Sequence, residues 1–187
     1  MSTRAMIGMF LALTAGIVIF LFVGMSDDED GGPIRVGSKT AAADCTKGDT
    51  CLPDLKWVDH NGTTYSKAEL AGKVVVVNFW ATWCKPCEHE IPAFSRVAGR
   101  YADKVVILGV MIDNPDDQTL LTYMSDHEMS YPVVRKTSDI MLAFAYPDRY
   151  PTTYVFDGKG NQRTWKVGAM QEAELSGVID QILRETN

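Results

Sequence analysis

The longest hydrophobic stretch of the chain comes first. Residues 5–25 contain no charged side chain, and about 20 apolar residues are enough to cross a bilayer as a helix. Arg4 precedes the stretch and an acidic cluster at residues 27–30 follows it. Because positive charge stays on the cytoplasmic side, residues 1–25 are predicted to anchor the chain in the cytoplasmic membrane. The N-terminus then lies inside and the rest of the chain on the extracytoplasmic, or periplasmic, side.

This anchor is expected to remain attached. The apolar run is longer than the usual core of a signal peptide, about 7 to 15 residues, and no small-residue cleavage pattern follows it closely. Residues 26–52 are acidic, then rich in Gly, Ser and other small residues, without periodicity. Such a composition is typical of a flexible linker. The folded domain is therefore predicted over residues 53–187.

Periodic patterns within residues 53–187 predict an α/β domain. Residues 73–81 are apolar at both parities, as in a strand that is buried on both faces of a parallel sheet. The Asn61-Gly62 pair predicts the turn of an N-terminal hairpin. Strands are expected at 55–60, 63–65, 73–81, 104–112, 131–134, 152–156 and 162–167, and helices at 66–72, 86–101, 117–129, 138–146 and 171–184. The predicted fold is a central mixed β-sheet flanked by helices.

The net charge and the distribution of basic residues bear on whether the chain binds nucleic acid. The net charge is -6 and the pI is near 5.0, and no cluster of Lys and Arg appears. Nucleic-acid binding depends on such clusters, so a nucleic-acid partner is excluded.

The chemistry of the chain centres on Cys84 and Cys87. A CxxC spacing alone also fits half of a zinc site, but Cys45 and Cys51 lie far upstream and His89 is next to the motif on its helix. Position favours redox chemistry, because Cys84 falls where the central strand ends and a helix begins. We therefore predict a redox-active disulfide, with no metal and no other cofactor.

The two cysteines are expected to have different roles. The amides and dipole at a helix N-terminus lower the pKa of a thiol there, so Cys84 is the predicted nucleophile. Cys87 lies one turn later and is the predicted resolving thiol. Lys85 adds positive charge that favours the thiolate, and Pro86 suits the first turn of a helix.

The run VVVVNFWATWCKPCEHEIP and the later YPTTYVFDGKGN, together with the anchored architecture, resemble the thioredoxin-like proteins of the TlpA and ResA type, relatives of CcmG. The resemblance covers residues 52–187. It implies a thioredoxin-like fold and a protein-disulfide reductase that acts on exported proteins, such as apocytochromes c or proteins with copper-site thiols. It also implies a membrane thiol transporter of the DsbD or CcdA kind as electron donor.

The same resemblance assigns further residues to the site. Pro151 matches the cis-proline that lies opposite the CxxC motif, and the residue before it, Tyr150, offers its backbone to a substrate. Thr152 and Trp83 complete the implied substrate-binding set, with Trp83 also shielding the sulfurs.

Two polar positions bear on proton transfer. Glu90 matches a family glutamate that tunes proton transfer at the two sulfurs. Alternatively, Glu90 is an acid that stabilises the first turn of the helix. Asn78 stands where thioredoxins have a buried acid, a departure that leaves Glu90 or water as the proton acceptor.

Cys45 and Cys51 depart from the family pattern. Five residues separate them, which is enough chain to close a small loop, and export favours a structural disulfide. The alternative is a second redox pair that exchanges with Cys84.

Other functions compete with disulfide reduction. A disulfide donor or isomerase would use the same chemistry at a different redox potential. A copper chaperone of the Sco type would need a wider cysteine spacing and a distant histidine. A peroxidase would need a lone cysteine after a threonine-containing loop. The CxxC motif favours the reductase over the last two.

Overall fold

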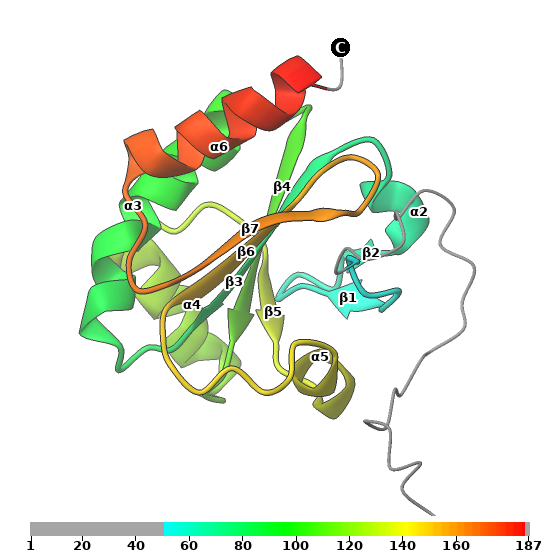
Figure 1. Cartoon of the computed structure of the whole chain (residues 1–187). Helices are drawn as coiled ribbons and strands as arrows, with labels where there is room; N and C mark the ends of the chain where they lie inside the picture. The colour runs from blue at the N-terminus through cyan, green and yellow to red at the C-terminus, as the bar shows by residue number, and fades with distance from the viewer. Residues whose placement is uncertain (1–50, 186–187) are drawn as a thin grey trace, which may run out of the picture. The chain divides into compact units, whose positions relative to one another are not determined.

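The computed structural model describes residues 51–185, all of which belong to one compact unit. At its centre lies a five-stranded sheet with the order β5-β4-β3-β6-β7 (Figure 1). The strands are β3 (Val74–Trp80), β4 (Val105–Met111), β5 (Val133–Arg135), β6 (Thr152–Phe156) and β7 (Gln162–Val167). β3 runs parallel to β4 and antiparallel to β6. The prediction of a mixed sheet is therefore confirmed.

Helices and a small hairpin cover the two faces of this sheet (Figure 1). The helices are α2 (Lys67–Leu70), α3 (Lys85–Arg100), α4 (Asp117–Asp126), α5 (Ser138–Ala143) and α6 (Glu172–Glu185), and the hairpin consists of β1 (Trp57–Val58) and β2 (Thr64–Tyr65). Side chains of α3, α4 and α6 share one apolar cluster, whereas the hairpin, α2 and α5 contribute to the other. The sheet thus has a core on each face.

Strand β3 is central because its sequence is apolar on both faces. All of its residues are buried. Val74 and Val76 pack into one core, and Val75 and Val77 pack into the other. Valine is stiff at χ1 and packs well on a pleated surface. The predicted central strand is confirmed, and its last residue leads directly toward Cys84.

Two helices end earlier than predicted. α4 ends at Asp126, and Glu128 then has a φ of 52°. α5 ends at Ala143, and both Ala145 and Tyr146 adopt left-handed conformations with φ of 54° and 52°. A residue with positive φ cannot continue a right-handed helix. Hydrophobic spacing does not reveal this change of backbone conformation.

The domain includes slightly more of the N-terminal side than predicted. Leu52 is buried in the second core, and its amide donates to the carbonyl of Gly160 at 2.7 Å. The predicted anchor at residues 1–25 lies outside the described residues. Between residues 51 and 185, no helix is long and apolar enough to cross a membrane.

Gly109 in β4 provides a test of the packing around the central strands. A Cβ atom at this position would lie 2.9 Å from Cε2 of Tyr131 and 3.0 Å from Nε1 of Trp80. We expect Gly109→Ala to lower the free energy of unfolding by about 1 to 3 kcal/mol, the usual effect of overpacking. Urea denaturation would measure the change.

Gly177→Ala is the matched control. Gly177 lies in α6, and a Cβ atom there would have no heavy atom within 4 Å. Alanine is the better helix former, so this variant should gain about 0.5 to 1 kcal/mol. Equal effects of the two substitutions would contradict close packing around Gly109.

Candidate active site

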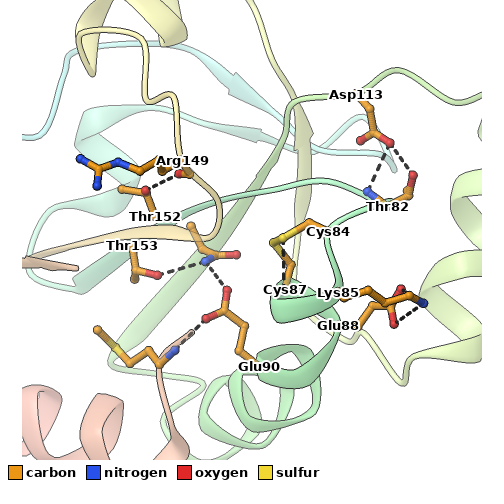
Figure 2. The surroundings of a disulfide bond; sticks show 12 residues. Thr82, Cys84, Lys85, Cys87, Glu88, Glu90, Asp113, Arg149, Thr152 and Thr153 are labelled. Carbon is orange, nitrogen blue, oxygen red and sulfur yellow. Dashed lines mark hydrogen bonds and ion pairs between the residues drawn. A yellow bond between two sulfur atoms is a disulfide. The ribbon is translucent and has the colours of Figure 1, made fainter. Parts of the chain in front are cut away.

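Cys84 lies at the junction of β3 and α3, where it caps the N-terminus of the helix. The amide of Cys87 donates to Sγ of Cys84 at 3.3 Å, and the amides of Cys87 and Glu88 donate to the Cys84 carbonyl at 3.0 and 3.2 Å. Cys84 and Cys87 form a disulfide with an S–S distance of 2.09 Å (Figure 2). The first turn of the helix therefore directs the Cys87 amide at the sulfur that is predicted to become the thiolate.

Burial distinguishes the two sulfurs. Cys84 retains 4% of its surface exposed, whereas Cys87 is fully buried. The neighbouring Trp83 is 63% exposed. Cys84 is therefore the more accessible of the two cysteines, as the roles of nucleophile and resolving thiol require.

Lys85 and Pro86 occupy the first turn of α3. Nζ of Lys85 lies 3.0 Å from Oε1 of Glu88, and the lysine side chain is 80% exposed. Solvent and Glu88 both screen this charge from Cys84. An influence of Lys85 on the thiolate stays a prediction, and the helix amides are the stronger contribution that the structure shows.

The loop before β6 faces the cysteine motif. Thr152 pairs with Phe79 in β3, so the preceding residues lie at the same edge of the sheet as the Cys84 loop. The peptide bond between Tyr150 and Pro151 is cis, the isomer that the family resemblance implies. The ring of Tyr150 meets that of Trp83 edge to face, with centroids 6.1 Å apart. These rings flank the approach to Cys84.

The substrate-binding role of Thr152 stays a prediction, and the structure gives its side chain a bond within the loop. Its side chain is buried, and its hydroxyl donates to the carbonyl of Arg149 at 2.6 Å (Figure 2). Similarly, the hydroxyl of Tyr150 donates to the carbonyl of Pro147 at 2.7 Å. Both hydrogen bonds lie within the loop around the cis peptide, so the Thr152 and Tyr150 hydroxyls help to fix its conformation.

A buried polar network lies beneath the cysteine pair. Nδ2 of Asn78 donates to Oε1 of Glu90 at 2.8 Å and to Oγ1 of Thr153 at 3.0 Å. Oε2 of Glu90 accepts from the amide of Met170 at 2.9 Å. Burial raises the pKa of the Glu90 carboxyl to about 7, although the hydrogen bonds from Met170 and Asn78 and the charge of Lys166 oppose the rise. Glu90 can therefore exchange a proton near neutral pH.

The position of Glu90 bears on its two interpretations. The acid in the first turn of α3 is Glu88, whereas Glu90 lies further along the helix and is only 1% exposed. A helix-stabilising surface acid would not be buried. Glu90 follows Cys87 by three residues, a spacing that places side chains on the same face of a helix. The location supports a role in proton transfer.

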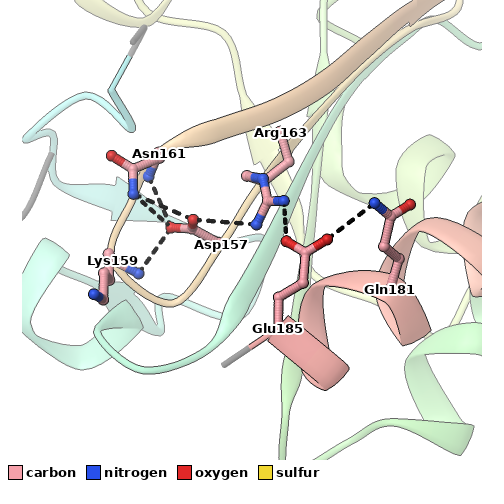
Figure 3. Close-up of polar contacts among 6 residues, drawn as sticks. All are labelled: Asp157, Lys159, Asn161, Arg163, Gln181 and Glu185. Carbon is pink, nitrogen blue, oxygen red and sulfur yellow. Dashed lines mark hydrogen bonds and ion pairs between the residues drawn. The ribbon is translucent and has the colours of Figure 1, made fainter. Parts of the chain in front are cut away.

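Cys51 lies at the opposite end of the sheet from Cys84. It is disulfide-bonded and pairs with Asn161 through an isolated β-bridge. Asn161 belongs to the turn after β6, where its amide donates to the Asp157 carboxylate at 3.0 Å (Figure 3). β6 begins beside Phe79 and ends beside Val75 in the pairing with β3.

This separation keeps Cys51 itself out of contact with Cys84, whereas the alternative of a Cys45–Cys51 redox pair that exchanges with Cys84 stays a prediction. The five steps from Val75 to Trp80 alone span about 17 Å at about 3.3 Å per residue, far more than an S–S bond. Cys45 lies outside the described residues, so a Cys45–Cys51 bridge stays a prediction.

Four site residues were not predicted from the sequence. Thr153 and the Met170 amide bind the Asn78–Glu90 pair, while Asp113 accepts hydrogen bonds from Thr82 in the loop before Cys84. Asp113 was detectable in principle, because it follows β4 at the edge where neighbouring parallel strands end. A backbone amide such as that of Met170 leaves no signal in the sequence.

Together, the mixed sheet, the disulfide at a helix N-terminus and the facing cis-proline loop define a thioredoxin-like thiol-disulfide oxidoreductase. The model of the AhpC/TSA family matches residues 49–163. The chain belongs to this family.

Named relatives agree with this class. The thioredoxin-like protein YneN of Bacillus subtilis (strain 168) is 31% identical over 130 residues, which cover 68% of this chain and 76% of YneN. The thiol-disulfide oxidoreductase ResA of Geobacillus kaustophilus (strain HTA426) is 31% identical over 146 residues, covering 77% and 80% of the two chains.

Among solved structures, a thiol:disulfide interchange protein of the thioredoxin family from Chlorobium tepidum TLS is similar with a TM-score of 0.66. It shares 31% sequence identity, and the match covers 74% of this chain and 99% of that chain. The enzyme class and the fold thus follow from both sequence and structure.

The raised pKa of Glu90 predicts a pH-dependent contribution to stability. The pKa is about 7 in the folded protein and about 4.3 in an unfolded chain. The folded state therefore holds its proton more tightly, and this stabilisation is present below pH 4 and lost as the pH rises to 7. Relative to Glu90→Gln, the oxidised protein should lose on the order of 3 kcal/mol between pH 4 and 8. Urea denaturation at each pH would measure this.

Glu172→Gln serves as a control with the opposite sign. Hydrogen bonds from Arg96 lower the pKa of the exposed Glu172, with a further contribution from Arg100. Any stabilisation by Glu172 is lost as the pH falls. A Glu90→Gln variant with the same pH profile as the parent protein would show that Glu90 ionises normally.

Proposed function

We propose that this protein is a membrane-anchored reductase of disulfides in exported proteins. The observation that carries the proposal is the Cys84–Cys87 disulfide at the N-terminus of α3, with the outer sulfur beside a cis-proline loop and Glu90 buried beneath. This arrangement supplies a nucleophile, a resolving thiol and a proton acceptor within one helix. The YneN and ResA relatives support the same chemistry.

In the proposed reaction the reduced protein transfers two electrons to its client. The Cys84 thiolate attacks one sulfur of the client disulfide, so that the client S–S bond breaks and a mixed disulfide forms. The departing client thiolate takes up a proton. Cys87 then loses its proton and attacks Sγ of Cys84, which restores the Cys84–Cys87 bond and releases the second client thiolate. The client ends reduced and the protein oxidised.

Glu90 is the proposed acceptor of the Cys87 proton. Its pKa of about 7 allows it to be a carboxylate before the second attack and a carboxylic acid afterwards. Asn78 and Met170 fix its two oxygens by hydrogen bonds. The Glu90 carboxyl would then take the place of the buried acid that thioredoxins have at the position of Asn78.

Client docking is proposed at the mouth of the site. The exposed ring of Trp83 meets that of Tyr150, and the backbone of Tyr150 precedes the cis bond. An extended client segment would pair with this backbone while its disulfide faces Cys84. Apocytochromes c and proteins with copper-site thiols are the proposed clients, since both require free cysteines.

The proposed electron donor is a membrane thiol transporter of the DsbD or CcdA kind. Thiols outside the cytoplasm need such a donor to stay reduced. Thiol-disulfide exchange is reversible, so a disulfide donor would use the same residues with a higher redox potential. Equilibration with glutathione separates the two directions.

Trapping the mixed disulfide tests the proposal. In Cys87→Ser the first attack still occurs, but the resolving thiol is absent, so clients should stay bonded to Cys84. Full-length Cys87→Ser would be expressed in its host, alkylated, and purified under non-reducing conditions. Mass spectrometry is expected to identify exported proteins with cysteine pairs.

The double variant Cys84→Ser, Cys87→Ser is the matched control, because it keeps Cys51 but lacks the nucleophile. It should yield no adducts and should reduce insulin only at the background rate. Adducts of equal amount in the control, or adducts only with cytoplasmic proteins, would contradict the proposed function.

The anchor gives a separate prediction. The uncharged run at residues 5–25 should keep the full chain in the membrane fraction after a carbonate wash, because about 20 apolar residues insert stably. A chain starting at residue 26 behind a cleavable export signal should be released. Because the domain is predicted to face outward, protease added to intact spheroplasts should digest it. A domain that resists the protease would contradict this orientation.

A further inference from the structure

Asp113 anchors the loop that carries Trp83 and Cys84. Oδ2 of Asp113 accepts a hydrogen bond from the amide of Thr82 at 3.2 Å and another from the Thr82 hydroxyl. Figure 2 shows this pair beside the Cys84–Cys87 disulfide. Trp80 pairs with Met111, the last residue of β4. The parallel strands therefore bring Asp113 and the cysteine loop to the same edge of the sheet.

Two backbone hydrogen bonds hold the ends of the loop that runs from Trp80 to Cys84. The amide of Ile112 donates to the carbonyl of Trp80 at 2.9 Å, and the amide of Cys84 donates to the carbonyl of Ala81 at 3.1 Å. Thr82 lies between these bonds, and both of its donors point to one carboxylate. Asp113 thus fixes the part of the loop that separates the strand from the nucleophile.

Asp113 also brings negative charge to this side of the site. Its Oδ1 is buried and accepts no hydrogen bond from any described residue. Burial raises the pKa of the nearby Tyr123 to about 12, with further contributions from the charges of Glu88 and Asp113. The positive charge of Lys85 is paired with Glu88. The Asp113 carboxylate therefore lies two residues from Cys84 along the loop, through its bonds to Thr82, while Lys85 is paired with Glu88 instead.

We propose that Asp113 is a positioning residue for the Cys84–Cys87 couple. It holds the loop through Thr82, and its charge disfavours the Cys84 thiolate, which opposes the helix amides. A less stable thiolate makes the dithiol a stronger reductant. The proposal needs only the thiol-disulfide chemistry of this enzyme class and no particular client or donor, so it stands apart from the proposed function.

Asp113→Asn separates charge from geometry. The amide oxygen still accepts from Thr82, but the negative charge is gone. The pKa of Cys84, measured by the pH dependence of alkylation of the reduced full-length protein, should fall. The equilibrium constant with glutathione should shift about tenfold toward the dithiol, which equals about 30 mV for a two-electron couple.

Thr82→Val separates geometry from charge. It keeps the shape of the side chain and removes the hydroxyl donor, so the loop loosens while the Asp113 charge remains. The rate of insulin reduction should fall several-fold without the shift toward the dithiol. Thr82→Ser restores the donor and should restore the rate.

Asp126→Asn, at the end of α4 and exposed, is the control and should match the parent protein in both measurements. The proposal is overturned if folded Asp113→Asn and Thr82→Val both keep the parental glutathione equilibrium and insulin rate. It is also overturned if Asp113→Asn moves the equilibrium toward the disulfide. Thermal unfolding of each variant verifies that it is folded.

Discussion

The hydrogen bond from the Cys87 amide to the Cys84 sulfur is the interaction around which the site is organised. It exists because β3 ends at Trp80 and α3 begins at Lys85, which leaves Cys84 as the N-cap. A sulfur at a helix N-terminus receives free amides and the positive end of the dipole. Moving the cysteine one residue in either direction would remove this contact. The fold therefore sets the reactivity before any neighbouring charge acts.

Below the cysteines, the site depends on a buried carboxyl that is not fully neutralised. Asn78 and Met170 donate to the two oxygens of Glu90, yet burial still raises its pKa to about 7. Two further donors, or a nearby buried cation, would hold the carboxyl ionised at neutral pH. Deeper burial without these donors would favour the protonated form. The number of donors thus matches an acid that gives and takes a proton.

The sequence predicted those parts of the structure that depend on local pattern. Val74 to Trp80 are apolar on both faces, and the structure buries all of them in the central strand. The CxxC motif followed this strand, so the N-terminal position of Cys84 was predictable. The Asn78–Glu90–Thr153 network was not, because Thr153 lies 75 residues from Asn78. Pairing of β3 with β6 brings them together, and no periodicity encodes that register.

The sequence was less informative about the loops. The hydroxyl of Thr152 beside the cis-proline donates to the Arg149 carbonyl inside the loop, a contact that the sequence did not indicate. Ala145 and Tyr146 have helical spacing with α5, yet their positive φ values end the helix early. In both cases the backbone of the loop before Pro151 decides the outcome. Sequence spacing describes regular elements better than it describes such loops.

The position of Cys51 shows how far the central strand separates it from the Cys84–Cys87 pair. Cys51 pairs with Asn161 at the turn after β6, while Cys84 follows the other end of β3. Exchange requires a thiolate to reach a sulfur directly, and the rigid central strand keeps these two apart. Cys51 therefore joins the N-terminal side of the domain to the turn held by Asp157.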